Sequence, residues 1–228
     1  MTSTRELWDS LDRHVWDQAL KRYWKRVEDE NRRPIEDKLN TLDPEWVRAM
    51  NPDEWYTFLR EDYFLWKFTD CRYCSRNRDL LKRQVESGGV AGLHRIKTQL
   101  FSFDTNDILE GLTIATGISG LGCAGASGLL AVLFPAHFGT VDQFVVKALS
   151  QVPELPEVER IRRMKPESLT IRDGVVLIGV MRTKAQALNA AFGCDTWTPR
   201  MVDMALWACR DEKNKGRSAT MTAENMFR

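Results

Sequence analysis

Apolar residues recur at intervals of three and four along most of the chain, the spacing that puts them on one face of an α-helix. The first run follows Ser3-Thr4-Arg5-Glu6, which reads as a capping box, and continues to just before Pro34. Asp43-Pro44 and Asn51-Pro52 each put a capping residue before a proline, which marks two more helix starts. We therefore predict one long N-terminal helix, a short second helix and a third helix over residues 53–68.

The pattern of apolar residues beyond residue 70 also predicts helices, and glycine and proline mark where these helices end. Residues 71–77 are predicted to form a loop, and Ser87-Gly88-Gly89 to end the helix that follows it. Pro153 and Pro156 mark a linker. Further helices are predicted over residues 78–86, 92–100, 106–115, 123–134, 142–149 and 198–207.

One segment, Leu169 to Met181, fits two structures. Asp173-Gly174 between β-branched residues suits a β-hairpin by local rules. The apolar run continues through residues 185–192, and the rest of the chain is helical, so a helix is favoured. Taken together, these segments predict an all-α fold.

Composition describes an ordinary globular protein. The chain has 228 residues, of which 43% are hydrophobic and 29% charged. No run approaches the roughly 18 apolar residues of a membrane span, and Met1 to Asp9 is too polar for a signal peptide. Five cysteines without a secretory signal indicate reduced thiols, so we expect a cytoplasmic protein, in a prokaryotic cytosol or nucleoid.

The cysteines do not predict a metal centre. Cys71-x-x-Cys74 has the spacing of half a zinc site, but no second cysteine pair and no histidine pair at ligand spacing completes it. We expect no metal and no organic cofactor.

Net charge is +1, so the chain as a whole carries no signature of nucleic-acid binding. The basic residues are nevertheless unevenly distributed. Residues 72–97 contain seven basic side chains and only two acidic ones. The basic residues are Arg72, Arg76, Arg78, Lys82, Arg83, Arg95 and Lys97. A solvated helix face and a nucleic-acid contact are both compatible with such a run.

The most informative stretch is residues 118–145. Gly120 and Gly122 flank Leu121, a spacing that permits positive φ and can expose backbone amides at the start of the next helix. A tight helix–helix turn explains that spacing equally well. Asp142 follows in an otherwise apolar setting, where an acidic residue is costly to bury unless it has a role.

Together these features resemble the helix-hairpin-helix DNA glycosylases, whose hairpin is followed by a helix and a Val-Asp pair. Here Ile118-Ser119-Gly120-Leu121-Gly122 corresponds to the hairpin, and Val141-Asp142 follows with Asp142 twenty positions after Gly122. The resemblance puts Asp142 at the family's catalytic aspartate. Two positions depart from the family pattern. Ser119 replaces the usual hairpin proline, and Ala124 stands where strand-cleaving members carry a Schiff-base lysine.

The resemblance implies a flipped nucleotide and a carboxylate that stabilises positive charge on the sugar as the glycosidic bond breaks. Helix capping is the alternative role for Asp142, and the two are compatible. Gly120, Leu121 and Gly122 would offer amides to a DNA phosphate, and the hairpin carbonyls could hold a monovalent cation. Cys194 and Cys209 alone cannot form the four-cysteine iron–sulfur cluster of some members.

The resemblance also suggests base-pocket and wedge residues. Residues 65–70 align with the family's wedge segment, and their Thr-Asp ending supports that alignment. Lys67 falls on the family's wedge, and Tyr63 on the glutamate of adenine-excising members. Tyr63 and Trp66 could stack on an extruded base. Trp66 in the core and Lys67 on the surface are the alternatives. His137 could touch phosphate or substrate, or be structural.

Asp203, on an apolar helix, is expected to pair internally and not to be catalytic.

We therefore expect a two-lobed helix-hairpin-helix glycosylase fold. Residues 1–75 and 151–209 would form one lobe and residues 76–150 the other, followed by a disordered tail over 210–228. The expected function is a monomeric, monofunctional DNA glycosylase, because Ala124 disfavours lyase chemistry. Its partner would be double-stranded DNA with a damaged or modified base, in base-excision repair or in defence against phage with modified DNA. A catalytically silent DNA-binding module and a protein-interaction domain of the same fold remain open alternatives.

Overall fold

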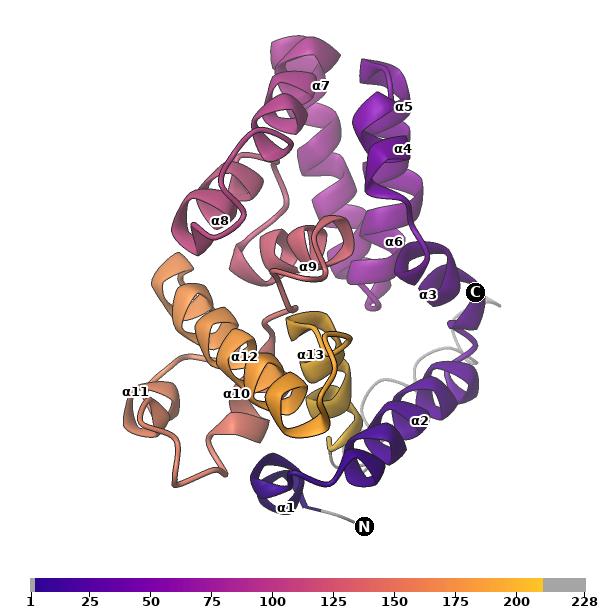
Figure 1. Cartoon of the computed structure of the whole chain (residues 1–228). Coiled ribbons are helices and arrows are strands. Elements are labelled where there is room, and N and C mark those ends of the chain that lie inside the picture. The colour runs from indigo at the N-terminus through magenta and orange to yellow at the C-terminus, as the bar shows by residue number, and fades with distance from the viewer. Residues whose placement is uncertain (1–2, 211–228) are drawn as a thin grey trace, which may run out of the picture.

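In the computed structural model, which describes residues 3–210, the chain forms α-helices and one π-helical segment and contains no β-strand in that range (Figure 1). The all-α prediction is confirmed. None of the helices described is long and apolar enough to cross a lipid bilayer. Apart from Arg210, the predicted tail lies outside the described residues.

The helices form two groups. The upper group in Figure 1 contains α4 to α9, and α3 lies between this group and the lower one, where it packs on α2 (Arg13–Asp29). Their bounds are Arg33–Asn40 for α3, Pro44–Ala49 for α4, Pro52–Thr57 for α5, Phe58–Tyr63 for the π-helix η1, Phe64–Lys67 for α6, Cys71–Leu100 for α7, Ile108–Thr116 for α8 and Cys123–Leu133 for α9. Within this group α5 and α6 pack on α7, and α8 packs on both α7 and α9.

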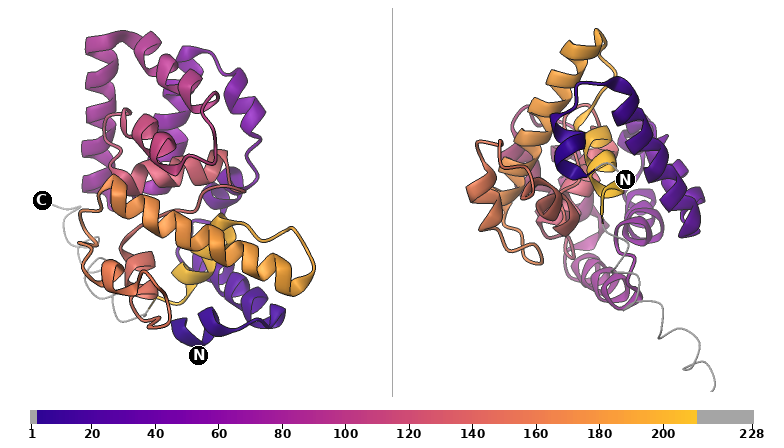
Figure 2. Two further views of the ribbon diagram at one scale, coloured as in Figure 1. Left: turned by 60° about the vertical axis from the view of Figure 1, so that its left-hand side comes forward. Right: turned by 90° about the horizontal axis from the view of Figure 1, so that it is seen from below.

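The lower group combines the two ends of the chain. It contains α1 (Thr4–Asp9), α2 (Arg13–Asp29), α10 (Gln143–Leu149), α11 (Val158–Arg162), α12 (Ile171–Phe192) and α13 (Pro199–Ala208). The most extensive packing in the molecule joins α2 to α13, and α12 lies along the boundary, where it also packs on α8 and α9 (Figure 2).

This arrangement differs from the predicted division of the chain. Residues 1–75 do not stay together, because α1 and α2 pack with the C-terminal helices whereas α4 to α6 pack with α7. At the second boundary, α10 packs on α11 and α13 of the lower group, although it was predicted to belong with the hairpin.

Two local predictions were wrong. The long N-terminal helix is broken at Ser10, because the Asp12 carboxylate accepts the His14 N–H and starts α2 anew. The loop predicted over residues 71–77 is the first two turns of α7, which Asp70 caps by accepting the Arg72 N–H. The break predicted at Ser87-Gly88-Gly89 is present as a kink inside α7, where Gly89 has φ 70° and ψ 160°.

The segment that fitted two structures is helical. Thr170 and Asp173 form a reciprocal capping box at the start of α12, and Gly193 ends the helix in the left-handed conformation. Asp173-Gly174 therefore belongs to a first helical turn and not to a hairpin.

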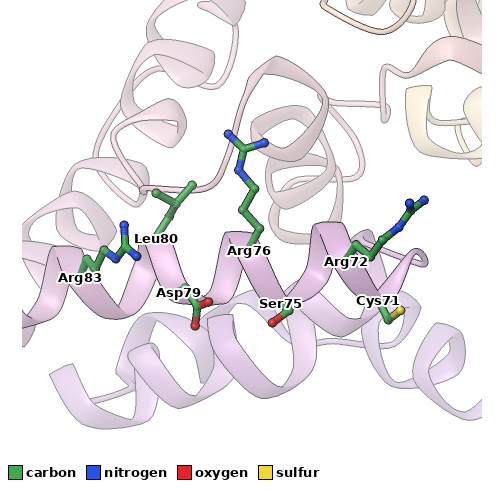
Figure 3. Close-up of a pocket in the computed structure, with 7 residues that line it drawn as sticks. All are labelled: Cys71, Arg72, Ser75, Arg76, Asp79, Leu80 and Arg83. Carbon is green, nitrogen blue, oxygen red and sulfur yellow. The ribbon is translucent and has the colours of Figure 1, made fainter. Parts of the chain in front are cut away.

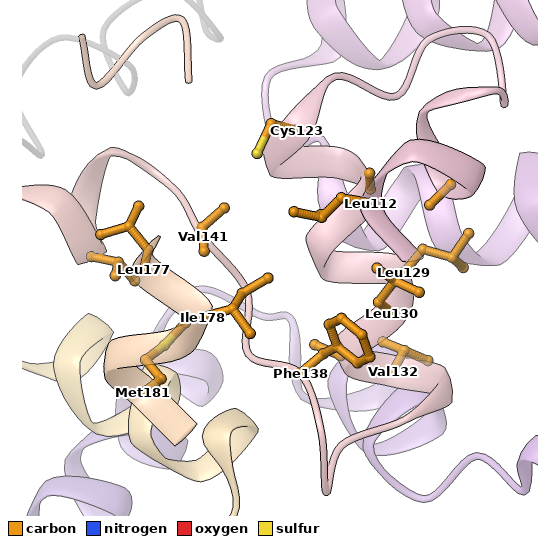
Figure 4. Packing of buried hydrophobic residues seen from close by; sticks show 14 of the residues in the cluster. Leu112, Cys123, Leu129, Leu130, Val132, Phe138, Val141, Leu177, Ile178 and Met181 are labelled. Atoms are coloured by element: carbon orange, nitrogen blue, oxygen red, sulfur yellow. The ribbon is translucent and has the colours of Figure 1, made fainter. Parts of the chain in front are cut away.

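A large apolar core runs through both groups, and a second, smaller cluster joins Tyr23 and Val27 of α2 to Met204 and Ala208 of α13. At the boundary, Leu112 of α8, Leu129 of α9 and Phe138 of the following loop lie opposite Ile178 and Met181 of α12 (Figure 4). These side chains are fully buried, so the relative position of the hairpin and the C-terminal helices is fixed by packing.

Candidate functional site: the hairpin, Asp142 and a buried ion network

The turn between α8 and α9 is a tight hairpin that requires glycine at position 120. Gly120 has φ 94°, and a Cβ there would lie 2.8 Å from the backbone oxygen of Asn77 on α7. A side chain would therefore be both strained and in collision with backbone.

Two of the three hairpin amides predicted to bind phosphate have no hydrogen-bond acceptor among residues 3–210, whereas the third is already used. The Leu121 N–H donates to the Ile118 carbonyl at 3.0 Å, so it is already used within the turn. Gly122 is the N-cap of α9 and supplies no side-chain cap, and no residue from 3 to 210 accepts from its N–H or from that of Gly120. These two amides and the uncapped first turn of α9 are the groups that remain to bind an anion.

Gln84 of α7 holds this hairpin in place. Its Nε2 donates to the Gly117 carbonyl at 2.7 Å, and its Oε1 accepts the Ser119 N–H at 2.8 Å. The monovalent cation expected here would have to use the turn's carbonyls, of which those of Gly117 and Ile118 already accept hydrogen bonds. Sequence reasoning missed Gln84, because nothing in the local pattern of α7 distinguishes it from other exposed polar residues.

The first half of α7 carries a basic groove beside the hairpin. The groove has a volume of about 860 Å³ and is lined by Cys71, Arg72, Ser75, Arg76, Asp79, Leu80 and Arg83 (Figure 3). Arg72 pairs with Asp70, whereas Arg76 and Arg83 form no ion pair within the described part of the chain. Asn77 and Gln84, which contact the hairpin, come from the same stretch of α7 as these two arginines.

Asp142 is the N-cap of α10. Its Oδ1 accepts the N–H groups of Phe144 at 2.8 Å and Val145 at 3.0 Å. Its Oδ2 accepts no hydrogen bond from residues 3–210, and the side chain is partly exposed. The cap role is thus present, and one carboxylate oxygen remains free for a further role.

The two residues before Asp142 are tied to different parts of the molecule. The Thr140 N–H donates to Asp203 Oδ2 of α13 at 2.6 Å, and the Val141 N–H donates to Ser127 Oγ of α9 at 3.0 Å. The second bond joins Asp142 to the helix that the hairpin starts.

Asp203 belongs to a buried network of charged and aromatic groups. Arg200 lies 2.7 Å from Asp203 and 2.7 Å from Glu36 of α3, and Glu36 also accepts from Tyr23 Oη and Trp66 Nε1. Burial raises the pKa of Asp203 to about 7, although Arg200 and the Thr140 N–H favour its charged form. The predicted internal pairing of Asp203 is confirmed. Glu36 and Arg200 were not found from the sequence, because they pair with each other across a separation of 164 residues.

The positions of Tyr63 and Trp66 do not match the predicted stacking role. Tyr63 is fully buried, and its Oη donates to the Gly125 carbonyl of α9. Trp66 is 8% exposed and donates to Glu36 at 2.6 Å. Neither ring presents a free face to a base, so both belong to the support of the site.

Lys67, predicted as a wedge at the surface, turns inward. Its side chain is partly buried and lies against α9, where a Cβ added to Gly128 would be 3.2 Å from the amine. Burial lowers the pKa of this amine, and Asp142 and Asp203 oppose that shift.

His137 lies in the loop between α9 and α10. Its backbone oxygen accepts from Arg182 of α12 at 2.6 Å. Burial and the Arg182 charge lower the pKa of its ring, while Asp104 opposes the shift. The contact that the structure shows for His137 is therefore structural, since Arg182 connects its loop to α12.

The cysteines are dispersed. Cys71 is exposed and Cys74 is buried, with its thiol directed at the Phe64 carbonyl. Nowhere in residues 3–210 do three histidine, cysteine or acidic side chains gather as a metal site would require.

Comparison of the chain with protein-family models, with curated proteins and with solved structures gives no match in any of the three.

Proposed function

We propose that the protein is a DNA N-glycosylase of the helix-hairpin-helix type, which flips a damaged or modified base and hydrolyses its glycosidic bond. The observation that carries the proposal is the hydrogen bond from the Val141 N–H to Ser127 Oγ. It holds Asp142 beside the helix whose N-terminus is the candidate phosphate site. This bond connects the segment that carries Asp142, with its one free carboxylate oxygen, to the helix that carries the anion anchor.

The expected chemistry follows from that pairing. The DNA backbone would bind the amides of Gly120, Gly122 and the first turn of α9, which fixes register without reading sequence. The free Oδ2 of Asp142 would stabilise the positive charge that develops on the sugar and orient a water for attack at C1′. Ala124 offers no amine, so base release is expected to proceed by hydrolysis.

The basic groove of α7 supports DNA as the partner despite the net charge of +1. Arg76 and Arg83 form no ion pair with described carboxylates, and they belong to the stretch of α7 whose Asn77 contacts Gly120 of the hairpin. A local cluster of this kind is sufficient for phosphate contacts. The same groove would serve a DNA-binding module that lacks catalysis.

The test is incubation with duplexes that carry alkylated, oxidised, deaminated or phage-type hypermodified bases, with mass spectrometry of the released base. Release of one class of base, with one abasic site formed for each base, would support the proposal. Salt-dependent binding without release of any base would favour the silent module. Absent or salt-insensitive DNA binding would favour a protein-interaction domain.

A further inference from the structure

The amine of Lys67 lies against α9, the helix that carries Ala124 at the family's lysine position. Gly128 lies one helical turn after Ala124 on α9. A Cβ at Gly128 would lie 3.1 Å from Lys67 Cδ, 3.2 Å from its Nζ and 2.8 Å from Tyr63 Oη, so glycine makes room for this side chain. An amine is therefore present over α9, although Ala124 does not supply it.

The end of α6 holds Lys67 firmly. Tyr63 Oη donates to the Gly125 carbonyl, and Arg32 donates to the carbonyl of Trp66, the residue before Lys67. Tyr63 is fully buried, and Arg32 is partly buried. The amine is consequently a positioned group and not the free end of a surface side chain.

The Lys67 amine has no hydrogen bond or ion pair with any residue from 3 to 210. The charged and titratable groups around it are Asp142, Asp203, Cys123 and Arg200. Burial is the largest influence and lowers the pKa of the amine, Arg200 lowers it further, and the two carboxylates and Cys123 act in the opposite direction. A lysine in this setting is neutral, and hence nucleophilic, for a larger fraction of the time than an exposed one.

We propose that Lys67 is the catalytic amine of an abasic-site lyase activity that follows base release. The inference rests on the glycosylase function proposed above, because it requires an abasic sugar beside Asp142. The lysine Nζ attacks the C1′ aldehyde of the ring-opened sugar, and the aldehyde oxygen leaves as water to give an iminium. The Asp142 carboxylate then takes a proton from C2′, the C3′–O bond breaks, and the 3′ phosphate leaves with the electron pair. Water hydrolyses the iminium and returns the free amine.

This activity differs from the prediction that Ala124 supports. Ala124 excludes an amine from the first turn of α9, and the hydrolytic release of the base remains as proposed. Lys67 adds a second step from α6, on the abasic product. The prediction of no strand cleavage considered only the family's position for the lysine.

The experiment uses the full chain and a duplex with one preformed abasic site, so that it does not depend on which base is excised. Sodium borohydride reduces the iminium and leaves a covalent protein–DNA adduct. Wild type, Lys67→Met, Asp142→Asn and Lys82→Met would be compared. Lys82 is an exposed lysine of α7 paired with Glu86, and it serves as the matched control.

We expect wild type and Lys82→Met to form the adduct and to break the strand without alkali. Asp142→Asn should still form the adduct but break the strand slowly, because it lacks the carboxylate that takes the C2′ proton. Lys67→Met should fall to the level seen without protein, and peptide mapping should find the wild-type adduct on Lys67. Its thermal midpoint should be unchanged or higher, because the substitution removes a partly buried amine that has no hydrogen-bond partner among residues 3–210.

An adduct that persists in Lys67→Met would overturn the proposal, as would a wild type that forms no adduct. Neither result bears on base release, which the modified-base duplexes measure separately. Conversely, failure to release any base while the adduct still forms on Lys67 would remove the glycosylase proposal and leave an amine that attacks abasic sugars.

Discussion

Asp203 Oδ2 accepts a 2.6 Å hydrogen bond from the backbone N–H of Thr140, two residues before Asp142. Through this bond a residue of the last helix fixes the loop that carries the candidate catalytic carboxylate. Asp203 is itself held by Arg200, which also pairs with Glu36 near the N-terminus. Segments from both ends of the chain thus determine where Asp142 lies.

Removal of Arg200 should be strongly destabilising. Arg200→Met would leave Glu36 and Asp203 buried without their cation, and breaking a buried pair costs about 3–5 kcal/mol. Chemical denaturation monitored by circular dichroism measures the change. Arg13→Met, which breaks an exposed pair with Asp17, is the control and should change the unfolding free energy by less than about 1 kcal/mol. Equal effects of the two substitutions would contradict the assigned importance of the network.

The stability of the protein should carry a pH dependence due to Asp203. Its pKa is about 7 in the folded protein, above its ordinary value of 3.8, because it is buried. The folded state therefore holds this proton more tightly, and its stabilising contribution is complete below pH 3.8 and lost as the pH rises through 7.

Unfolding curves at several pH values would test this, with Asp203→Asn for comparison. Relative to the variant, wild type should lose stability as the pH rises from 4 to 7. A constant difference between the two proteins over that range would show that Asp203 does not titrate there.

Substitution of Gly120 should weaken both the hairpin and DNA binding. Gly120→Ala puts a Cβ 2.8 Å from the Asn77 oxygen in a left-handed conformation, a strain of about 1–3 kcal/mol. Gly88→Ala on α7 is the matched control, since a Cβ there meets nothing within 4 Å. Thermal unfolding and binding to an abasic duplex would be measured for both variants. Greater damage from Gly88→Ala would contradict the structure of the hairpin.

The basic groove should determine the salt dependence of DNA binding. Arg76→Gln and Arg83→Gln should each weaken binding for all sequences and reduce the slope of log affinity against log salt by about 1. Lys25→Gln on α2, away from the hairpin, should leave the slope unchanged. Fluorescence anisotropy at several salt concentrations supplies the slopes. Unchanged slopes in both groove variants would show that DNA phosphates contact a different surface of the protein.

The sequence predicted elements well where the signal is local. The capping residues Asn51, Asp142 and Thr198 start helices as expected, and Gly120 and Gly89 both depart from helical geometry. The sequence-based prediction failed at residues 71–77. Their polar composition suggested a loop, but Asp70 caps a helix that begins at Cys71.

The site was predicted only in part, because its partners are distant in sequence. The hairpin and Asp142 were found through their spacing, whereas Glu36, Arg200 and Gln84 act through contacts that no local pattern reveals. Tyr63 and Trp66 were assigned to a pocket because aromatic residues suit both a core and a stacking platform. Only tertiary packing distinguishes those two roles.

The most direct test of the glycosylase proposal is the rate of base release by Asp142→Asn under single-turnover conditions, on a modified duplex that wild type processes. Asparagine keeps the acceptor that caps α10 and removes only the charge, so the fold should be preserved. Asp107→Asn, the equivalent change at the N-cap of α8, is the control. We predict that Asp142→Asn binds the duplex with wild-type affinity and releases base at least about a hundredfold more slowly, while Asp107→Asn retains activity. Base release by Asp142→Asn at the wild-type rate would contradict the account.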